Sequence, residues 1–297
     1  MKTDRVYSVV AHVLLMMTVL VCVLPFLLLV IVSFTDEASI VEKGYSFFPT
    51  SWSLAAYEYL MLTGGSMVRA FGMSILVTAL GTLIHVALVT MYAYPMSRRD
   101  YPLRKAMIVF TLIPMLFNGG LVPTYLWYSG TLQIRNTLAA LLVPNLLFNC
   151  FNVILLRTYF QNSVPSAVIE SASIDGATEN CIFWKIVLPL AKPIIATVSL
   201  FSALAYWNDW INGLYYLYDP DYFTLQVLLN RLMADVQFMT SAAATSPAIA
   251  ASIQNVDLPS STIRMAIAVV SIVPMLTLFL PLQKYFARGI TIGALKG

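Results

Sequence analysis

Six long apolar segments limit what this chain can fold into. A helix of about 20 mostly apolar residues is long enough to cross the hydrocarbon core of a bilayer. Hydrophobic residues make up 59% of the chain and charged residues 10%, and a water-soluble fold could not cover so much apolar surface. The sequence therefore predicts an all-α, polytopic membrane protein, with residues 1–297 as a single transmembrane domain. The six predicted transmembrane helices cover approximately residues 8–34, 70–97, 106–128, 138–160, 191–214 and 265–286.

The distribution of basic residues predicts the orientation of these helices. Six crossings place both termini on the same side of the membrane. If that side is the cytoplasm, 12 of the 17 Lys and Arg residues lie in cytoplasmic segments and 5 in outer segments. Because cytoplasmic loops carry an excess of Lys and Arg, the sequence predicts that both termini are cytoplasmic.

Two segments could change the number of crossings. The first apolar segment is too long for the h-region of a signal peptide and lacks an A-x-A-like cleavage site, so we interpret it as a retained helix. A stretch rich in Ala and Ser, residues 241–252, is too short to cross. We place it in a long outer loop, residues 212–264, together with an amphipathic stretch at residues 223–237.

Residues that carry chemistry are scarce. The ATP-binding pattern G-x-x-x-x-G-K-[ST] does not occur in the sequence. A membrane-embedded Ser–His protease is not supported, because His85 and Ser74 on the second segment are three helical turns apart. We expect no catalytic residue, no metal, no cofactor bound by this chain, and no nucleic acid among its partners. The Cys and His residues have no spacing that is typical of a metal site: Cys22, Cys150, Cys181, His12 and His85.

The connection between the fourth and fifth predicted helices, residues 161–190, carries helix signals of its own. Ser163 followed by Pro165 is typical of a helix start, and this helix would extend to about Ile174. Gly176 then interrupts it, because glycine adopts backbone angles that other residues avoid. We call residues 161–190 the elbow.

A second short helix is expected after the glycine. Asp175 or Thr178 can cap it, and it would cover about residues 179–186. Pro189 would end this helix and open the fifth transmembrane helix. The elbow would then consist of two short helices on the cytoplasmic face.

The surface of the elbow allows two interpretations: an amphipathic hairpin on the lipid surface or a knob gripped by another protein. The acidic residues Glu170, Asp175 and Glu179 outnumber Lys185. Acidic residues are poor ligands for an anionic cytoplasmic leaflet, so a protein partner is favoured. The apolar residues of the elbow include Val168, Ile169, Ile174, Ile182 and Phe183.

The spacing within the elbow resembles a known family. Permease subunits of bacterial ABC importers carry E-A-A, three residues, Gly, nine residues and I-x-L-P. Ser171 stands where the pattern has its first Ala, and Asp175-Gly176-Ala177 is similar to the core of the sugar-importer branch. The matching residues at the same spacing are Glu170, Ala172, Gly176, Ile186, Leu188 and Pro189.

Two further motifs extend this resemblance. The C-terminal residues 283–297 look like the end of oligosaccharide and polysaccharide permeases of this family. The sequence Trp-Asn-Asp-Trp at 207–210 is similar to an element of the same group. The chain thus resembles maltose-type and alginate-type second permease subunits.

The resemblance implies a type I ABC importer permease fold in the bacterial cytoplasmic membrane and import of an oligo- or polysaccharide, with alginate-like chains among the candidates. Its implied partners are two P-loop ATPase subunits that bind ATP and Mg, a second permease of different sequence, an extracytoplasmic solute-binding protein and membrane lipid. Glu170, Asp175, Gly176 and Ala177 would contact an ATPase. Gly176 would allow close approach and could also serve as an ordinary helix C-cap.

Polar residues on the predicted helices are candidates for the solute pathway. Aromatic faces, amides and carboxylates suit sugars, although Trp and Tyr also collect at membrane boundaries. We interpret a stripe on the second helix, from Ser74 through Thr78 and Thr82 to His85, as helix packing. The pathway candidates are Asn145, Asn149, Asn152, Tyr206, Trp207, Asn208 and Asp209.

The main alternative is a secondary transporter driven by an ion gradient. That class predicts inverted repeats and acidic residues at the middle of the membrane. The sequence shows no clear repeat, and Asp209 lies near the outer end of its helix. This alternative also does not explain the elbow.

Overall fold

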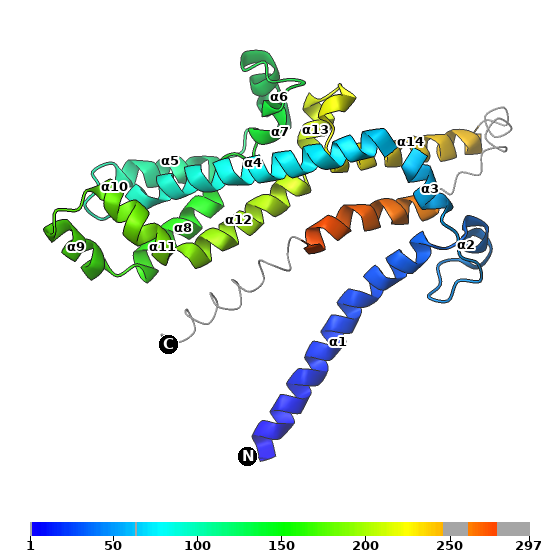
Figure 1. The fold of residues 1–297 in the computed structure, drawn as a ribbon, viewed down its shortest axis with the longest axis horizontal. Helices are drawn as coiled ribbons and strands as arrows, with labels where there is room; N and C mark the ends of the chain where they lie inside the picture. Colours follow the sequence, from blue (N-terminus) through cyan, green and yellow to red (C-terminus); the bar gives the residue numbers. More distant parts are fainter. Residues whose placement is uncertain (1, 63, 246–260, 278–297) are drawn as a thin grey trace. The chain divides into compact units, whose positions relative to one another are not determined.

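The computed structural model describes residues 2–62, 64–245 and 261–277. Within these ranges the regular structure is helical, apart from an isolated bridge between Thr35 and Trp52 (Figure 1). The prediction of an all-α fold is confirmed for this part of the chain. The described residues divide into two compact units, one within Met1–Met67 and Leu229–Pro274 and the other within Val68–Leu228 and Met275–Gly297.

The first unit begins with a long apolar helix, α1 (Lys2–Ser33). Its segment Tyr7–Ser33 is long and apolar enough to cross a bilayer, and the side chains from Tyr7 to Leu27 are exposed, as lipid contact requires. Glu37 joins two parts of this unit, because its carboxylate accepts hydrogen bonds of 2.9 Å from the backbone N–H groups of both Ser261 and Thr262. The other helices here are α2 (Glu37–Lys43), α3 (Ala55–Leu62), most of α14 (Leu225–Thr245) and a helix at Ser261–Thr277.

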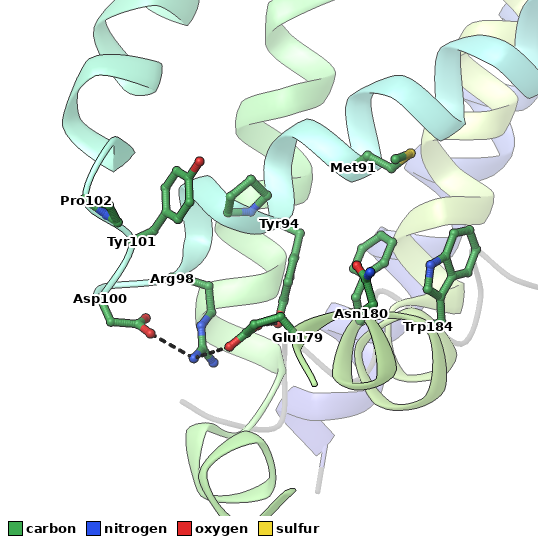
Figure 2. Close-up of a pocket in the computed structure, with 11 residues that line it drawn as sticks. Met91, Tyr94, Arg98, Asp100, Tyr101, Pro102, Glu179, Asn180 and Trp184 are labelled. Atoms are coloured by element: carbon green, nitrogen blue, oxygen red, sulfur yellow. Dashed lines mark hydrogen bonds and ion pairs between the residues drawn. The ribbon is translucent and has the colours of Figure 1, made fainter. Parts of the chain in front are cut away.

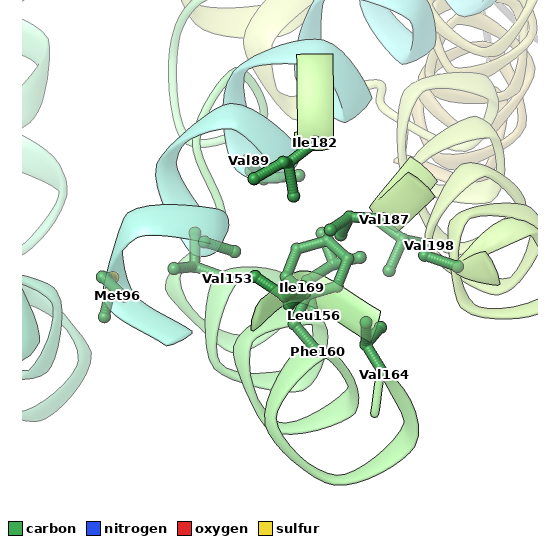
Figure 3. Close-up of a cluster of buried hydrophobic side chains, with 12 residues drawn as sticks. Val89, Met96, Val153, Leu156, Phe160, Val164, Ile169, Ile182, Val187 and Val198 are labelled. Atoms are coloured by element: carbon green, nitrogen blue, oxygen red, sulfur yellow. The ribbon is translucent and has the colours of Figure 1, made fainter. Parts of the chain in front are cut away.

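The second unit contains the elbow and the helices around it. Its main buried cluster brings α4, α8 and α12 together with both halves of the elbow, including Ile169 of the first half and Ile182 and Val187 of the second (Figure 3). The helices of this unit outside the elbow are α4 (Gly64–Ser97), α5 (Arg104–Leu116), α6 (Leu121–Leu126), η1 (Trp127–Thr131), α7 (Ala139–Leu142), α8 (Cys150–Ser163), α12 (Lys192–Trp207), α13 (Ile211–Tyr216) and η3 (Pro220–Tyr222).

The third and fourth predicted helices are not continuous. The sequence predicts a break in the third, through Pro114, Asn118-Gly119-Gly120 and Pro123, whereas the fourth was expected as one helix and that prediction was wrong. In the third, α5 and the helical segment Leu121–Thr131 meet at an angle of 115°, because the chain turns at Gly120 with φ +85°. In the fourth, α7 and α8 are separated by a non-helical segment, residues 143–149. We call residues 143–149 the break. It contains Pro144, which has no N–H to donate to a helix.

The fifth predicted helix is shorter than expected. α12 ends at Trp207 and is followed by α13. The sixth is described only within Ser261–Thr277, and residues 278–286 and the C-terminal motif lie outside the described residues. The amphipathic stretch in the predicted outer loop forms the start of α14, whereas residues 246–252 are not described.

By length and composition, two described helices can cross a membrane, Tyr7–Ser33 and Gly65–Ser97. The number rises to four if each of two bent pairs counts as one crossing. The six crossings therefore stay a prediction.

Candidate functional site

The first helix of the elbow is α9 (Ser166–Ile174), and most of its residues are exposed. Ile169 is its buried residue, whereas Ile174 is 86% exposed and Glu170 is exposed. The expected cap was misplaced, because Ser163 is the last residue of α8 rather than the start of α9. The residue before a proline avoids the helical conformation. Val164 is therefore extended, α8 ends before it, and α9 begins after Pro165.

The turn after α9 is a Schellman motif. Gly176 has φ +81°, the left-handed conformation that glycine adopts most readily. The N–H of Ala177 donates to the carbonyl of Ala172 at 2.9 Å, and the N–H of Gly176 donates to the carbonyl of Ser173 at 3.1 Å. These are the two hydrogen bonds that define the motif. Gly176 is therefore a helix C-cap, as one of the two sequence interpretations expected.

The second helix of the elbow is anchored in the core. Thr178 caps it, since its side-chain oxygen accepts a hydrogen bond of 3.4 Å from the N–H of Cys181. Ile182, Phe183 and Val187 are buried. Ile182 and Val187 belong to the cluster that also includes Val89 of α4 (Figure 3), and Phe183 packs against Tyr94, which contacts this cluster. The elbow thus has one mostly exposed helix, which contributes Ile169 to this cluster, and a second helix that is anchored in it by several residues.

The second helix extends further than predicted. α10 (Glu179–Ile182) continues through a π-helical turn, η2 (Phe183–Val187), into α11 (Leu188–Leu190). The N–H of Leu188 bonds the carbonyl of Phe183, five residues back, just before Pro189, which has no N–H. The prediction that Pro189 ends the helix was wrong: the wider turn carries the helix past it. Lys192–Trp207 then departs at 79° from Glu179–Leu190.

The start of the second elbow helix is linked to the end of α4. The Glu179 carboxylate accepts hydrogen bonds from the Tyr94 hydroxyl at 2.8 Å and from Arg98 at 3.2 Å, and Arg98 also donates to Asp100 at 3.1 Å. These residues line a pocket of about 450 Å³ that also includes Trp184 (Figure 2). Sequence reasoning missed this link, because its partners are 81 residues apart and neither belongs to a motif.

Local electrostatics keep Arg98 charged. Partial burial by itself lowers the pKa of Arg98, but the hydrogen bond to Asp100 and the negative charges of Glu179 and Asp100 raise it above its ordinary value. The guanidinium is therefore charged at any physiological pH and binds the Glu179 carboxylate across the junction between α4 and the elbow, as well as the neighbouring Asp100 carboxylate.

Three of the pathway candidates are buried. Tyr206 and Trp207 are each 2% exposed and Asn152 is 5% exposed. Trp207 packs edge-on against Phe71, with ring centroids 6.0 Å apart. The three side chains therefore pack inside this chain in the structure, and their place in the solute pathway stays a prediction.

Side chains from other helices hold the backbone of the break and the end of α7. The Tyr206 hydroxyl donates to the carbonyl of Leu142 at 2.9 Å, and the Asn212 amide donates to the carbonyl of Pro144 at 3.0 Å. His85 places its Nδ1 2.9 Å from the carbonyl of Leu146. Irregular backbone inside a membrane protein needs such partners, since lipid offers none.

His85 is a neutral structural partner, as the sequence indicated. Its Nδ1 also lies 3.1 Å from the carbonyl of Leu147, and its Nε2 lies 2.9 Å from the amide nitrogen of Asn152. A carbonyl needs a donor and an amide N–H needs an acceptor, so these contacts assign the proton to Nδ1. Ser74, at the other end of the stripe, also contacts another helix: its hydroxyl accepts a 2.7 Å hydrogen bond from the N–H of Leu225 in α14.

The remaining pathway candidates are at least partly exposed. Asn145 is exposed in the break with φ +61°, and Asn149 caps α8 by accepting from the N–H of Asn152. Asn208 is exposed, with its amide bonded to the carbonyl of Leu204 one turn back. Asp209 is half-buried and accepts from the N–H of Asn212 at 3.2 Å.

Comparison with known proteins identifies the class of this chain. Residues 84–292 match the family of binding-protein-dependent transport system inner membrane components. The chain belongs to this family, and the resemblance seen in the elbow motif is confirmed. Membership also favours an ABC permease over a secondary transporter.

Individual relatives cover nearly the whole chain. It is 37% identical to the polygalacturonan/rhamnogalacturonan transport system permease protein YtcP of Bacillus subtilis, over 99% of each chain. It is 29% identical to the melibiose/raffinose/stachyose import permease protein MelC of the same species, over 78% of this chain and 77% of the relative. A solved chain from a bacterial ABC transporter involved in the import of the acidic polysaccharide alginate superposes with a TM-score of 0.79 at 27% identity, covering 96% and 98% of the two chains.

Proposed function

We propose that this chain is one of two different permease subunits in an ATP-driven importer of the bacterial cytoplasmic membrane. It would receive an oligo- or polysaccharide from an extracytoplasmic binding protein and pass it to the cytoplasm. Acidic, alginate-like chains are among the candidate solutes. The relatives support the carbohydrate class, since their names include polygalacturonan, melibiose and alginate transport.

The single observation that carries this proposal is the unequal burial of the two elbow helices. α9 presents exposed Glu170 and Asp175 beside the open Gly176 turn, where no atom lies within 4 Å of an added Cβ. The helix after the turn is fixed in the core through Ile182 and Val187. A hairpin on the lipid surface would not need such anchoring. A segment that transmits force from an ATPase subunit to the membrane helices would need it.

The chemistry of the elbow suits a protein partner. Glu170 and Asp175 can accept charge-assisted hydrogen bonds from Arg or Lys on an ATPase, and the small side chains of Ala172 and Ala177 keep the turn compact. Ile186, Leu188 and Pro189 belong to the anchored helix. ATP and Mg would be bound by the ATPase subunits, and this chain would contribute the mechanical contact.

The proposed topology has six crossings with both termini in the cytoplasm. The elbow and the end of α4 at Arg98 would then lie on the cytoplasmic side, where the excess of basic residues is expected. Arg69 would lie at the outer end of α4.

The break is the best candidate for contact with the solute. His85, which holds it, is 12 residues from Ser97 at the inner end of α4, or about 18 Å at 1.5 Å per residue. The break would therefore lie near the middle of the bilayer, where irregular backbone is tolerated if it is buried or lines a cavity. The exposed amide of Asn145 would face that cavity and exchange hydrogen bonds with sugar hydroxyls.

Purification of the tagged chain from its native membrane in mild detergent, followed by mass spectrometry, tests the proposal. Stoichiometric recovery of a P-loop ATPase and a second permease is expected. Recovery of the chain alone in every preparation would contradict the importer assignment and favour the lipid-surface interpretation of the elbow. Uptake of labelled uronate and neutral oligosaccharides by cells with and without the chain then identifies the solute class.

A further inference from the structure

We propose that Glu179, Arg98 and Tyr94 transmit movement of the elbow to α4 during transport, so that they are positioning residues for coupling. This inference rests on the proposed importer function and assigns a route to the force that an ATPase would apply.

The link joins two elements that are distant in sequence. Glu179 is the first residue of α10, three residues after Gly176, and Arg98 directly follows the last residue of α4, Ser97. The two carboxylate oxygens of Glu179 are used separately, Oε2 by Tyr94 and Oε1 by Arg98. Two bonds to one carboxylate fix its direction as well as its distance, as a mechanical link requires.

Aromatic contacts surround the same junction. The ring of Tyr94 lies 5.0 Å from that of Phe183 and 6.4 Å from that of Phe160, measured between centroids. Tyr94 thus touches the second elbow helix through both its ring and its hydroxyl. Figure 2 shows Tyr94, Arg98 and Glu179 converging on one side of the pocket, with Trp184 further along the same elbow segment.

Stability alone does not account for the link. Arg98 is 20% exposed, but the side chain of Glu179 is 59% exposed, and ion pairs this open to solvent add little to the free energy of unfolding. The apolar cluster already fixes the second elbow helix to α4. The polar link therefore fixes the orientation of Glu179, the first residue of α10. A force transmitted from α9 through the turn would reach the second elbow helix at this residue.

The pocket makes the link testable by substitution. Because Arg98, Glu179 and Tyr94 border open space of about 450 Å³, altered side chains fit without displacing the buried cluster. The chain also supplies a matched control at the outer end of α4, where Arg69 forms an ion pair with Asp221 and both side chains are more than 60% exposed.

The test uses the complete complex reconstituted in proteoliposomes, with solute uptake and ATP hydrolysis measured together. Glu179→Gln, Arg98→Gln and Tyr94→Phe are expected to retain the ATPase subunits while lowering the solute moved per ATP by at least fivefold. The exchange Arg98→Glu with Glu179→Arg should restore part of the loss, and Arg69→Gln with Asp221→Asn should change nothing. Wild-type uptake per ATP in the single variants, or loss of the ATPase subunits from them, would overturn the link.

A cross-linking measurement tests whether α4 and the elbow move together during transport or move relative to each other. With Cys22, Cys150 and Cys181 replaced by Ser, the pair Arg98→Cys and Glu179→Cys is joined by a short bifunctional thiol reagent. Before joining, this pair should show the low solute uptake per ATP of the single variants, because the ion pair is lost. Joining should restore part of the uptake if α4 and the elbow move together, and no gain or a further loss on joining would overturn the proposal. Failure of the importer function itself has a different signature, since the wild-type complex would then show no ATP-dependent uptake.

Discussion

Two regions of the second unit interrupt its helices: the elbow turn at Gly176 and the break at residues 143–149. They differ in how their backbone groups find hydrogen-bond partners. Each contains a residue with positive φ, Gly176 at +81° and Asn145 at +61°. The elbow turn satisfies its backbone with hydrogen bonds inside six residues, Ala172 to Ala177. The break instead depends on side chains of Tyr206, Asn212 and His85, located on other helices. A local turn can move as a body, whereas a break held from several sides is fixed to its surroundings.

The largest expected effect comes from a bulky residue in the local turn. Gly176→Trp should leave the amount of protein in the membrane unchanged, because the space around the glycine is open, and should abolish uptake of labelled oligosaccharide. Gly44→Trp is the matched control, since Gly44 also has positive φ and open space but lies at the end of α2. Wild-type uptake by Gly176→Trp would contradict the role of the elbow in coupling.

Removing a side chain that holds the break should lower stability. His85→Ala leaves the carbonyls of Leu146 and Leu147 without their donor, which costs about 1–3 kcal/mol for buried polar groups. Thermal unfolding of the purified complex measures the change. His12→Ala on exposed α1 is the control and should have no effect. Equal melting temperatures for the two variants would mean that the break does not depend on His85.

At Asn145, backbone and side-chain contributions can be separated. Asn145→Ala places an unfavourable residue at positive φ and should cost about 1 kcal/mol, while Asn145→Gly keeps the conformation. If the amide contacts the solute, the KM of uptake rises in both variants, but the melting temperature falls mainly in the Ala variant. Gln133→Gly, at an exposed residue with φ +50°, controls for the glycine. An unchanged KM in Asn145→Gly would remove Asn145 from the pathway.

The smallest expected difference lies between two mild substitutions at the elbow turn. Asn adopts the left-handed conformation more readily than Ala. Gly176→Asn should therefore retain more solute uptake per ATP than Gly176→Ala, with a conformational difference of about 1 kcal/mol or less. The reverse order would show that the size of the residue, rather than the backbone angle, limits coupling at this position.

The same contrast explains what could be predicted from the sequence. The elbow turn was predictable because Gly176 and Thr178 act on neighbouring residues, and local signals encode both the C-cap and the N-cap. Ser163 was misjudged because Pro165 affects the residue before it as well as those after it, which places the end of α8 where a helix start was expected.

The break could not be predicted from local pattern. Residues 138–160 are apolar enough to suggest one helix, and the partners that stabilise an interruption are 61 to 68 residues away. Tyr206 and Asn152 were assigned to the solute pathway because a polar group on an apolar helix has two common uses, and the sequence alone does not distinguish them. The link between Arg98 and Glu179 depends in the same way on the packing of α4 against the elbow.

The timing of synthesis adds a further consequence of the break. His85 precedes it in the chain, but Tyr206 and Asn212 are synthesised 64 and 68 residues after their carbonyl partners. At roughly 5–20 residues per second, this delay is on the order of 3–14 s. During that interval the carbonyls of Leu142 and Pro144 lack their later donors and cannot be released into lipid without cost. We expect variants of Tyr206 and Asn212 to reduce the yield of inserted protein before they affect the transport rate of the molecules that do insert.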